Sequence, residues 1–216
     1  MNFFAKLKLY LMSLEEPATW IFDRRSKTVL DVGCGQGIPM KSLNFHFKFK
    51  KSVGVDLFDE YIKQCKAEHI HTDYQKKDVR KITFKKNSFD TVMCLQVVEH
   101  LSKKDAWNLI EKMEKIAKRQ IIIATPIGHL DHDEVDHNHL QLHKSFFYPE
   151  EFKERGYKII QFGRKELYGN NGLVHKLPFP FYILVFFLNF LLIPIYKLFP
   201  NFGNYHFYAY KKIKNL

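Results

Sequence analysis

The chain has 216 residues and carries 34 lysines and arginines against 23 aspartates and glutamates, which gives a formal net charge of +11. This length suits a single α/β domain with an appendage and excludes an assembly of several large domains. The three cysteines are dispersed, which excludes a disulfide-rich secreted scaffold and predicts a reducing, cytoplasmic compartment.

Residues 2–14 predict a basic amphipathic helix, because apolar residues recur on one face at helical spacing. Those apolar residues are Phe3, Leu7, Leu11 and Leu14. Such a helix usually packs over a sheet, although a basic one can also lie on a membrane. No small-residue cleavage site follows the apolar run, so we expect no signal peptide. We expect residues 1–25 to form this helix and a linker, followed by one domain over residues 26–216.

The organising feature of the sequence is a glycine loop that follows a short apolar stretch. Thr28–Val32 predicts a buried strand of a parallel sheet, because the stretch lacks clean polar alternation. Gly33, Gly35 and Gly37 follow it and precede a helix that begins at about residue 38. Glycines at this point let a ligand approach the backbone closely, with a helix N-terminus pointing at it.

Two carboxylates give the glycine loop its chemical context. Asp31 lies at the end of the first strand, where it can orient the loop or meet a cationic ligand. Asp56 ends a second short apolar strand, residues 52–56, roughly 20 residues past the loop. An acid at that distance can accept hydrogen bonds from ribose hydroxyls. These features predict a nucleoside-containing ligand on a doubly wound sheet.

With these residues, the sequence resembles the class I S-adenosylmethionine-dependent methyltransferases of the type 11/12 kind. The resemblance runs over residues 26–163 and rests on VLDVGCGQG at 29–37, KDV at 77–79, FDTVMC at 89–94 and VEHL at 98–101. The nicotinamide-type fingerprint G-x-G-x-x-G is not met, because no third glycine follows in phase. The resemblance implies an α/β, doubly wound, Rossmann-like sheet of order 3-2-1-4-5-7-6 with an antiparallel last strand. It also implies S-adenosyl-L-methionine as the cofactor.

The resemblance assigns cofactor-binding roles to individual residues. Asp56 is the acid that holds the ribose, Leu57 stacks on the adenine, and Asp78 accepts from the adenine amino group. The full predicted set is Asp31, Gly33, Cys34, Gly35, Gly37, Asp56, Leu57, Asp78, Val79 and Leu95.

The rest of the chain continues the alternation of strands and helices. Further strands are predicted within residues 70–75 and at 89–95, 120–126, 157–162 and 205–212. Further helices are predicted at 58–68, at 149–155, and from the N-cap Ser102 to about residue 118. Asp90, at the start of the fourth strand, is expected to be structural.

The segment after the fourth strand decides whether a metal is expected. Some members of the resembling family hold a divalent metal with E-x-x-E-H here, whereas this chain has Gln96 in place of the first carboxylate before Glu99 and His100. Glutamine is a neutral and weaker ligand, so we expect no metal. The alternative metal site would use His143 as an additional ligand.

Histidines crowd the loop after the fifth strand, residues 129–143. Their spacing does not predict a zinc site, because they lack regular partners on one element. In the resembling family this loop closes over the acceptor, so we expect a polar rim with one histidine as a general base. The catalytic candidates are His100, His139 and His143.

Residues 177–196 form an uncharged apolar segment of about the length that spans a bilayer. A single span is incompatible with pairing of the sixth and seventh strands in one sheet. Pro178, Pro180 and Pro194 also leave an unbroken helix of only about 20 Å. We therefore expect an apolar helical insertion over about residues 173–202, which dips into one leaflet, forms a lid, or faces a second copy in a homodimer.

The predicted function is S-adenosylmethionine-dependent O- or N-methylation of a small-molecule, lipid-linked or membrane-proximal acceptor. It would take place in the cytoplasm, with peripheral contact to the inner membrane face through residues 177–196. Two other functions stay open. An RNA methyltransferase is favoured by the charge, but the chain lacks a recognised RNA-binding module, so nucleic acid is the less favoured partner. The other alternative is a non-catalytic protein that binds the cofactor or a membrane.

Overall fold

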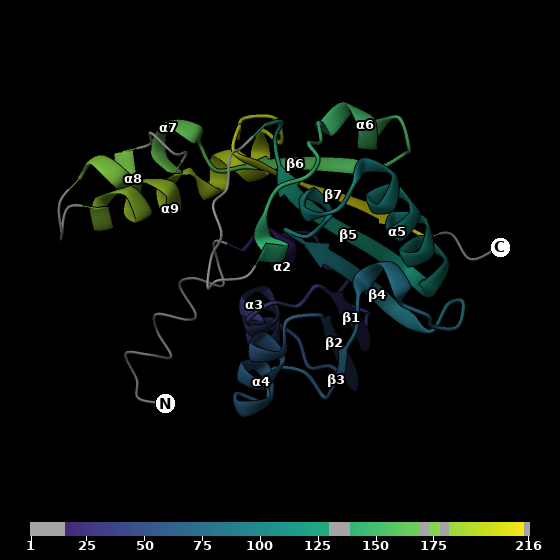
Figure 1. The fold of residues 1–216 in the computed structure, drawn as a ribbon. Helices are drawn as coiled ribbons and strands as arrows, with labels where there is room; N and C mark the ends of the chain where they lie inside the picture. The colour runs from purple at the N-terminus through teal and green to yellow at the C-terminus, as the bar shows by residue number, and fades with distance from the viewer. Residues whose placement is uncertain (1–15, 130–138, 169–172, 178–181, 214–216) are drawn as a thin grey trace.

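Figure 1 shows the computed structural model of the chain, which describes residues 16–129, 139–168, 173–177 and 182–213. Its seven strands form one sheet of order β3-β2-β1-β4-β5-β7-β6, which confirms the predicted fold. The strands are β1 (Thr28–Val32), β2 (Lys51–Asp56), β3 (Asp73–Lys76), β4 (Phe89–Leu95), β5 (Ala117–Pro126), β6 (Lys158–Phe162) and β7 (His206–Lys212). β7 is antiparallel to both β5 and β6, as predicted, and the other neighbours pair in parallel.

Helices cover both faces of the sheet. One face carries α2 (Pro17–Ile21), α3 (Ile38–His46) and α4 (Asp59–Ala67), and the other carries α5 (Lys103–Ile116) and α6 (Pro149–Lys153). Val29 of β1 packs with the first group and Leu30 with the second. Successive residues of a strand point to opposite faces, so covering both faces explains why the strands read as continuous apolar runs.

Most element boundaries lie within two residues of the sequence predictions, and those of β5, α5 and β3 illustrate the differences. β5 begins at Ala117, earlier than predicted, because Ala117 pairs with Phe89 beyond an irregularity in the register of β4 and β5. α5 accordingly ends at Ile116, before the predicted residue 118. β3 lies slightly later than predicted, at Asp73–Lys76. The strand ends at these boundaries are polar, so a prediction based on runs of apolar residues does not include them.

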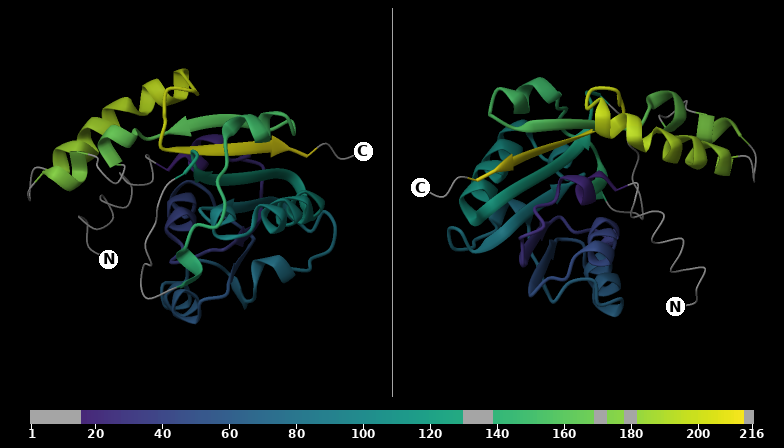
Figure 2. Two further views of the ribbon diagram at one scale, coloured as in Figure 1. Left: turned by 45° about the horizontal axis from the view of Figure 1, so that its top comes forward. Right: turned by 180° about the vertical axis from the view of Figure 1, so that it is seen from behind.

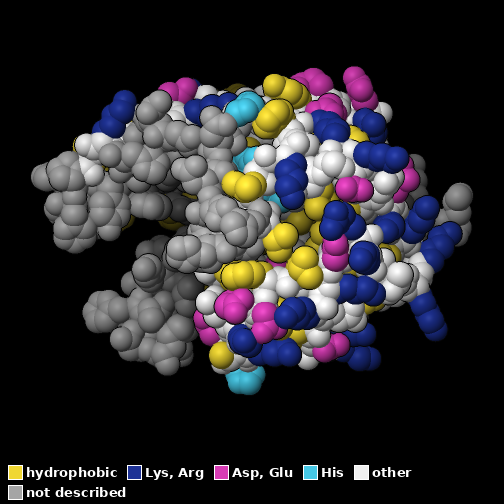
Figure 3. All heavy atoms as spheres, in the orientation of Figure 1, with side chains coloured by type: hydrophobic (Ala, Val, Ile, Leu, Met, Phe, Trp, Pro, Cys, Tyr) yellow, Lys and Arg dark blue, Asp and Glu magenta, His cyan; other side chains and the backbone are white. Residues whose placement is uncertain are grey.

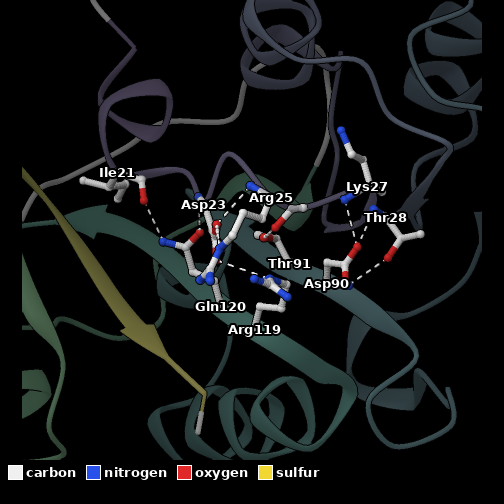
Figure 4. Close-up of polar contacts among 10 residues, drawn as sticks. Ile21, Asp23, Arg25, Lys27, Thr28, Asp90, Thr91, Arg119 and Gln120 are labelled. Atoms are coloured by element: carbon white, nitrogen blue, oxygen red, sulfur yellow. Dashed lines mark hydrogen bonds and ion pairs between the residues drawn. The ribbon is translucent and has the colours of Figure 1, made fainter. Parts of the chain in front are cut away.

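The amino edge of the sheet is held by hydrogen bonds that tie the segment before β1 to β4 and β5 (Figure 4). The side-chain amide of Gln120 donates to the carbonyl of Ile21 at 2.7 Å and accepts from the backbone N–H of Asp23 at 2.7 Å. The Asp90 carboxylate accepts from the backbone N–H groups of Lys27 and Thr28. Asp90 therefore has a structural role, as predicted.

An apolar insertion connects β6 to β7 and contains α7 (Lys165–Tyr168), α8 (Leu173–Lys176) and α9 (Tyr182–Leu198). α9 is a single helix that runs through Pro194, so the prediction that this proline ends the helix is wrong. Ile193 and Tyr196 beside the proline are buried, so packing supports the helix despite the missing N–H donor. Figures 1 and 2 show the insertion projecting beyond the sheet on the side of β6 and β7. The amphipathic helix predicted for residues 2–14 lies outside the described residues.

Candidate functional site

The candidate site is a cavity of about 670 Å³ at the carboxyl edge of the sheet. It lies where β1, β2 and β4 end, which is where ligands bind in open α/β sheets. Its size is that of a small-molecule site. The structure brings every predicted cofactor-binding residue to its wall: Asp31, Gly33, Cys34, Gly35, Gly37, Asp56, Leu57, Asp78, Val79 and Leu95.

The glycine loop is folded so that two of its glycines have no room for a side chain. Gly33 has φ +73°, and a Cβ there would lie 2.3 Å from Cγ2 of Val97. Gly37 has the same φ and is the N-cap of α3, where a Cβ would lie 2.8 Å from Cδ1 of Ile70. The N–H of Gly33 donates to the carbonyl of Val55 at 2.7 Å, which fixes the loop on β2. The loop therefore presents bare backbone to the cavity at the start of a helix.

Asp56 connects the loop to the end of β2. Its Oδ2 accepts from the N–H of Gly35 at 2.8 Å, and its Oδ1 accepts from the N–H of Phe58 at 2.9 Å. Burial raises the pKa of Asp56, although these backbone donors oppose the rise. A carboxylate has about four lone-pair positions, so Asp56 can still accept from a diol in the cavity.

The predicted adenine side contains an ion pair that the sequence did not indicate. Arg80 donates to Asp78 through Nε and Nη2, with a shortest distance of 2.6 Å. Hydrogen bonding from Arg80 lowers the pKa of Asp78, so the carboxylate is charged. Leu57 lines the cavity and is 40% exposed, which suits a surface on which a flat ring could stack. The adenine contacts of Leu57 and Asp78 remain predictions.

The opposite side of the cavity contains His100, one of the three catalytic candidates. Its Nδ1 lies 3.3 Å from the carbonyl of Leu142, and its ring centroid lies 5.0 Å from that of His143. His100 is among the residues that line the cavity, whereas His143 is not. His139 begins η3 (His139–Gln141), and its side chain lies outside what the structure describes. Lys144 also lines the cavity and was not predicted.

Glu99 lies beneath this side of the cavity and is 2% exposed. Its carboxyl group accepts from the hydroxyl of Thr125 at 3.0 Å, and burial raises its pKa to about 8. Ligand atoms of Glu99, His100 and His143 lie within 4.8 Å of one another, so these residues could hold a divalent metal. A metal would have to displace the proton that Glu99 holds at neutral pH. Gln96, at the position of the missing carboxylate, also lines the cavity.

A buried ion pair behind the glycine loop was missed by the sequence analysis. Nε2 of His71 lies 2.9 Å from Oδ2 of Asp31, and both side chains are almost fully buried. Burial alone lowers the pKa of His71, but Asp31 and the neighbouring Cys65 outweigh this effect and raise it to about 9. Asp31 therefore faces an imidazolium of its own chain. No local sequence signal links His71 to Asp31, because the pair forms only when β3 joins the sheet.

Comparison with known proteins agrees with this geometry. A family model described as "Methyltransferase domain" matches residues 29–120. A ubiquinone biosynthesis O-methyltransferase of Nitrosomonas europaea is 32% identical over 98 residues, which are 43% of this chain and 40% of that relative. The chain thus spans well under half the length of this curated relative.

Two solved structures share the fold over nearly the whole chain. An S-adenosylmethionine-dependent methyltransferase from Archaeoglobus fulgidus has a TM-score of 0.61 at 19% identity, over 98% of this chain and 100% of its own. Magnesium protoporphyrin IX methyltransferase from Synechocystis, with bound S-adenosylmethionine, has a TM-score of 0.56 at 13% identity, over 99% and 85% of the two chains. At these identities the likeness shows the fold.

Proposed function

We propose that this chain is a class I S-adenosylmethionine-dependent methyltransferase. It transfers a methyl group to an oxygen or nitrogen of a small-molecule acceptor. The observation that carries the proposal is the convergence of the predicted cofactor residues on one cavity at the carboxyl edge. S-Adenosyl-L-methionine is the cofactor of this family and supplies a methyl group on an electrophilic sulfonium.

The residues of the cavity divide into a cofactor side and an acceptor side. On the cofactor side, Asp56 accepts from the ribose hydroxyls, and the glycine loop leaves room for the amino-acid part of the cofactor. On the acceptor side, His100 is placed to take the proton of an attacking hydroxyl or amine. Holding the acceptor in line with the methyl group is the main contribution of the protein.

The acceptor is proposed to be apolar or lipid-linked. Leu101 and Leu140 line the acceptor side, and Leu140 is 41% exposed. The similar protein from Nitrosomonas europaea is named for O-methylation in ubiquinone biosynthesis, which supports oxygen as the methylated atom. We place the protein in the cytoplasm with peripheral contact to the membrane, a contact developed in the next subsection. A homodimer is the alternative use of the apolar insertion.

The RNA alternative is less well supported. Figure 3 shows lysines and arginines on the displayed face interspersed with acidic side chains, without one continuous basic stripe. Sequence-independent RNA binding needs a basic groove with aromatic stacking platforms. The cavity instead contains the ion-paired Arg80 and the acids Asp56 and Asp105.

The test of the proposed function is methyl transfer from labelled S-adenosylmethionine to a cell lipid extract, compared with total RNA. We expect label in the lipid fraction. Asp56→Ala should weaken cofactor binding by about 1–3 kcal/mol, because ribose hydroxyls lose their acceptor. The half-buried Asp59, which pairs with Lys63 and Lys76, provides the matched control Asp59→Ala. Label in RNA alone, or equal cofactor affinity for the two variants by calorimetry, would contradict the proposal.

Transfer is expected to proceed without a divalent metal. Gln96 replaces a carboxylate, and burial holds Glu99 as a neutral acid although the hydrogen bond from Thr125 opposes this effect. Turnover measured in excess EDTA should therefore stay within about twofold of the untreated rate, because proximity and alignment supply the catalysis. Loss of activity that magnesium or manganese restores would show that Glu99, His100 and His143 are metal ligands.

A further inference from the structure

We propose that the outer face of α9 docks on an anionic membrane surface. This inference deepens the proposed function, because it names the source from which an apolar acceptor reaches the cavity. It rests on four observations: the exposed apolar face of α9 opposite its buried face, its anchoring to the sheet, its position at the carboxyl edge, and the charge of the C-terminal part of the chain.

α9 has a buried face and an exposed face that are both apolar. The buried positions are Val185, Asn189, Ile193 and Tyr196, at successive helical turns. The exposed positions are Leu184 at 55%, Phe187 at 63%, Leu188 at 38%, Leu191 at 70% and Leu198 at 73%. An exposed apolar face of this extent is unusual on a soluble monomer and marks an interaction site.

The buried face fixes the orientation of the helix. The hydroxyl of Tyr196 donates to Oδ1 of Asn189 at 3.1 Å, and both side chains are buried. The ring of Tyr196 lies 5.0 Å from that of Phe162, the last residue of β6. Nζ of Lys197 lies 4.8 Å from the ring of Trp20. α9 is therefore attached to the sheet by one face, and the opposite face is left for a partner.

The insertion starts and ends at the edge of the sheet that contains the cavity. His206, where β7 begins, pairs with Pro126 and with Phe162, the last residues of β5 and β6. Because β5 and β6 run in the same direction as β1 and β4, these ends lie at the carboxyl edge. A membrane bound at α9 would thus lie at the same edge of the sheet as the acceptor side.

In the C-terminal part of the chain, the insertion carries a charge that favours an anionic partner. Glu166, the last acidic residue of the sequence, pairs with Arg164. Lys176 of α8 and Lys197 of α9 are both exposed. Each lysine close to an anionic leaflet raises membrane partitioning several-fold. A second copy docked on α9 would bring lysines of both copies together, so charge favours the membrane over a homodimer.

The helix would lie on the membrane rather than cross it. Across the residues that the structure describes, no helix combines the length and the apolar character needed for a bilayer span. α9 has 17 residues and is therefore about 26 Å long, which suits a helix lying in the plane of the interface.

The test is flotation of the full chain with vesicles of phosphatidylglycerol and phosphatidylcholine, compared with phosphatidylcholine alone. We expect the wild type to float with the anionic vesicles at least tenfold more than with the neutral ones. Leu191→Glu should lower this flotation at least tenfold. Phe45→Glu introduces the same charge at a 40% exposed position of α3, and should float like the wild type.

Calorimetric binding of S-adenosylhomocysteine by all three proteins separates this inference from the proposed function, because docking and cofactor binding use different residues. We expect equal affinities. Wild type that remains at the bottom of the gradient with both vesicles would overturn the docking proposal while leaving cofactor binding intact. An equal loss of flotation in Leu191→Glu and Phe45→Glu would also overturn it. The proposal would likewise fail if sedimentation equilibrium showed that the wild type is a dimer and that Leu191→Glu dissociates it.

Discussion

Gly33→Ala is expected to lower the free energy of unfolding by about 2–5 kcal/mol. It should also lower the affinity for S-adenosylhomocysteine, because the glycine loop is displaced from the position at which it would bind the cofactor. Two effects add. A residue with a side chain is strained at φ +73°, and its Cβ would lie 2.3 Å from Cγ2 of Val97. Val97 is β-branched and stiff at χ1, so it cannot turn aside easily. Urea denaturation measures the first quantity, and calorimetric titration the second.

Two further variants separate strain from crowding. Gly35 has φ +50°, but a Cβ there would meet nothing within 4 Å, so Gly35→Ala should show only the strain, about 1–2 kcal/mol. Val97→Ala in the Gly33→Ala background removes the clash and should restore about half of the lost stability. Equal destabilisation by Gly33→Ala and Gly35→Ala would show that the approach of Val97 to the loop is unimportant.

The convergence of the predicted cofactor residues on one cavity was predictable from the sequence, because these residues are local to strand ends. The glycine loop and Asp56 each follow a short apolar strand, and the parallel arrangement brings such ends together. The acceptor side was less predictable. His100 lines the cavity, but the candidate His143 does not, and Lys144 was missed. His143 and Lys144 belong to a loop whose path depends on distant contacts. For example, the backbone N–H groups of Lys144 and Ser145 donate hydrogen bonds to the carbonyl of Glu99.

The fold, too, was predictable only where it depends on local sequence and not on tertiary contacts. The order of the strands followed from the family resemblance, while long apolar runs such as β4 were visible in the sequence itself. β5 was predicted too short because Lys118 and Arg119 are polar, although pairing of Ala117 with Phe89 extends the strand through them. α9 was predicted to end at Pro194, but packing of Ile193 and Tyr196 against the domain supports the helix beyond it.

His71→Leu is expected to lower the free energy of unfolding by about 3–5 kcal/mol at pH 6.5, because it leaves the Asp31 carboxylate buried without its partner. The His71 side chain is 0% exposed and that of Asp31 is 5% exposed, so water cannot replace the lost contact. Adding Asp31→Asn to His71→Leu should recover part of the loss, since the buried charge is then absent. The exposed His46 provides the control His46→Leu, which should change stability little. Urea denaturation measures all four proteins.

The pH dependence distinguishes an ion pair from mere packing. The pKa of His71 is about 9 in the folded state, against about 6.5 for an unperturbed histidine. Below pH 6.5 the imidazole is protonated in both states, so the stabilisation by the pair is fully present. As the pH rises from about 6.5 to about 9, the unfolded chain releases this proton and the folded chain keeps it. The contribution of His71 to stability therefore falls over this window by about 3 kcal/mol. His71→Leu should lack this fall, so the difference between wild type and variant should shrink at pH 9.5. Parallel stability curves from pH 6 to 9.5 would show that His71 acts through packing alone.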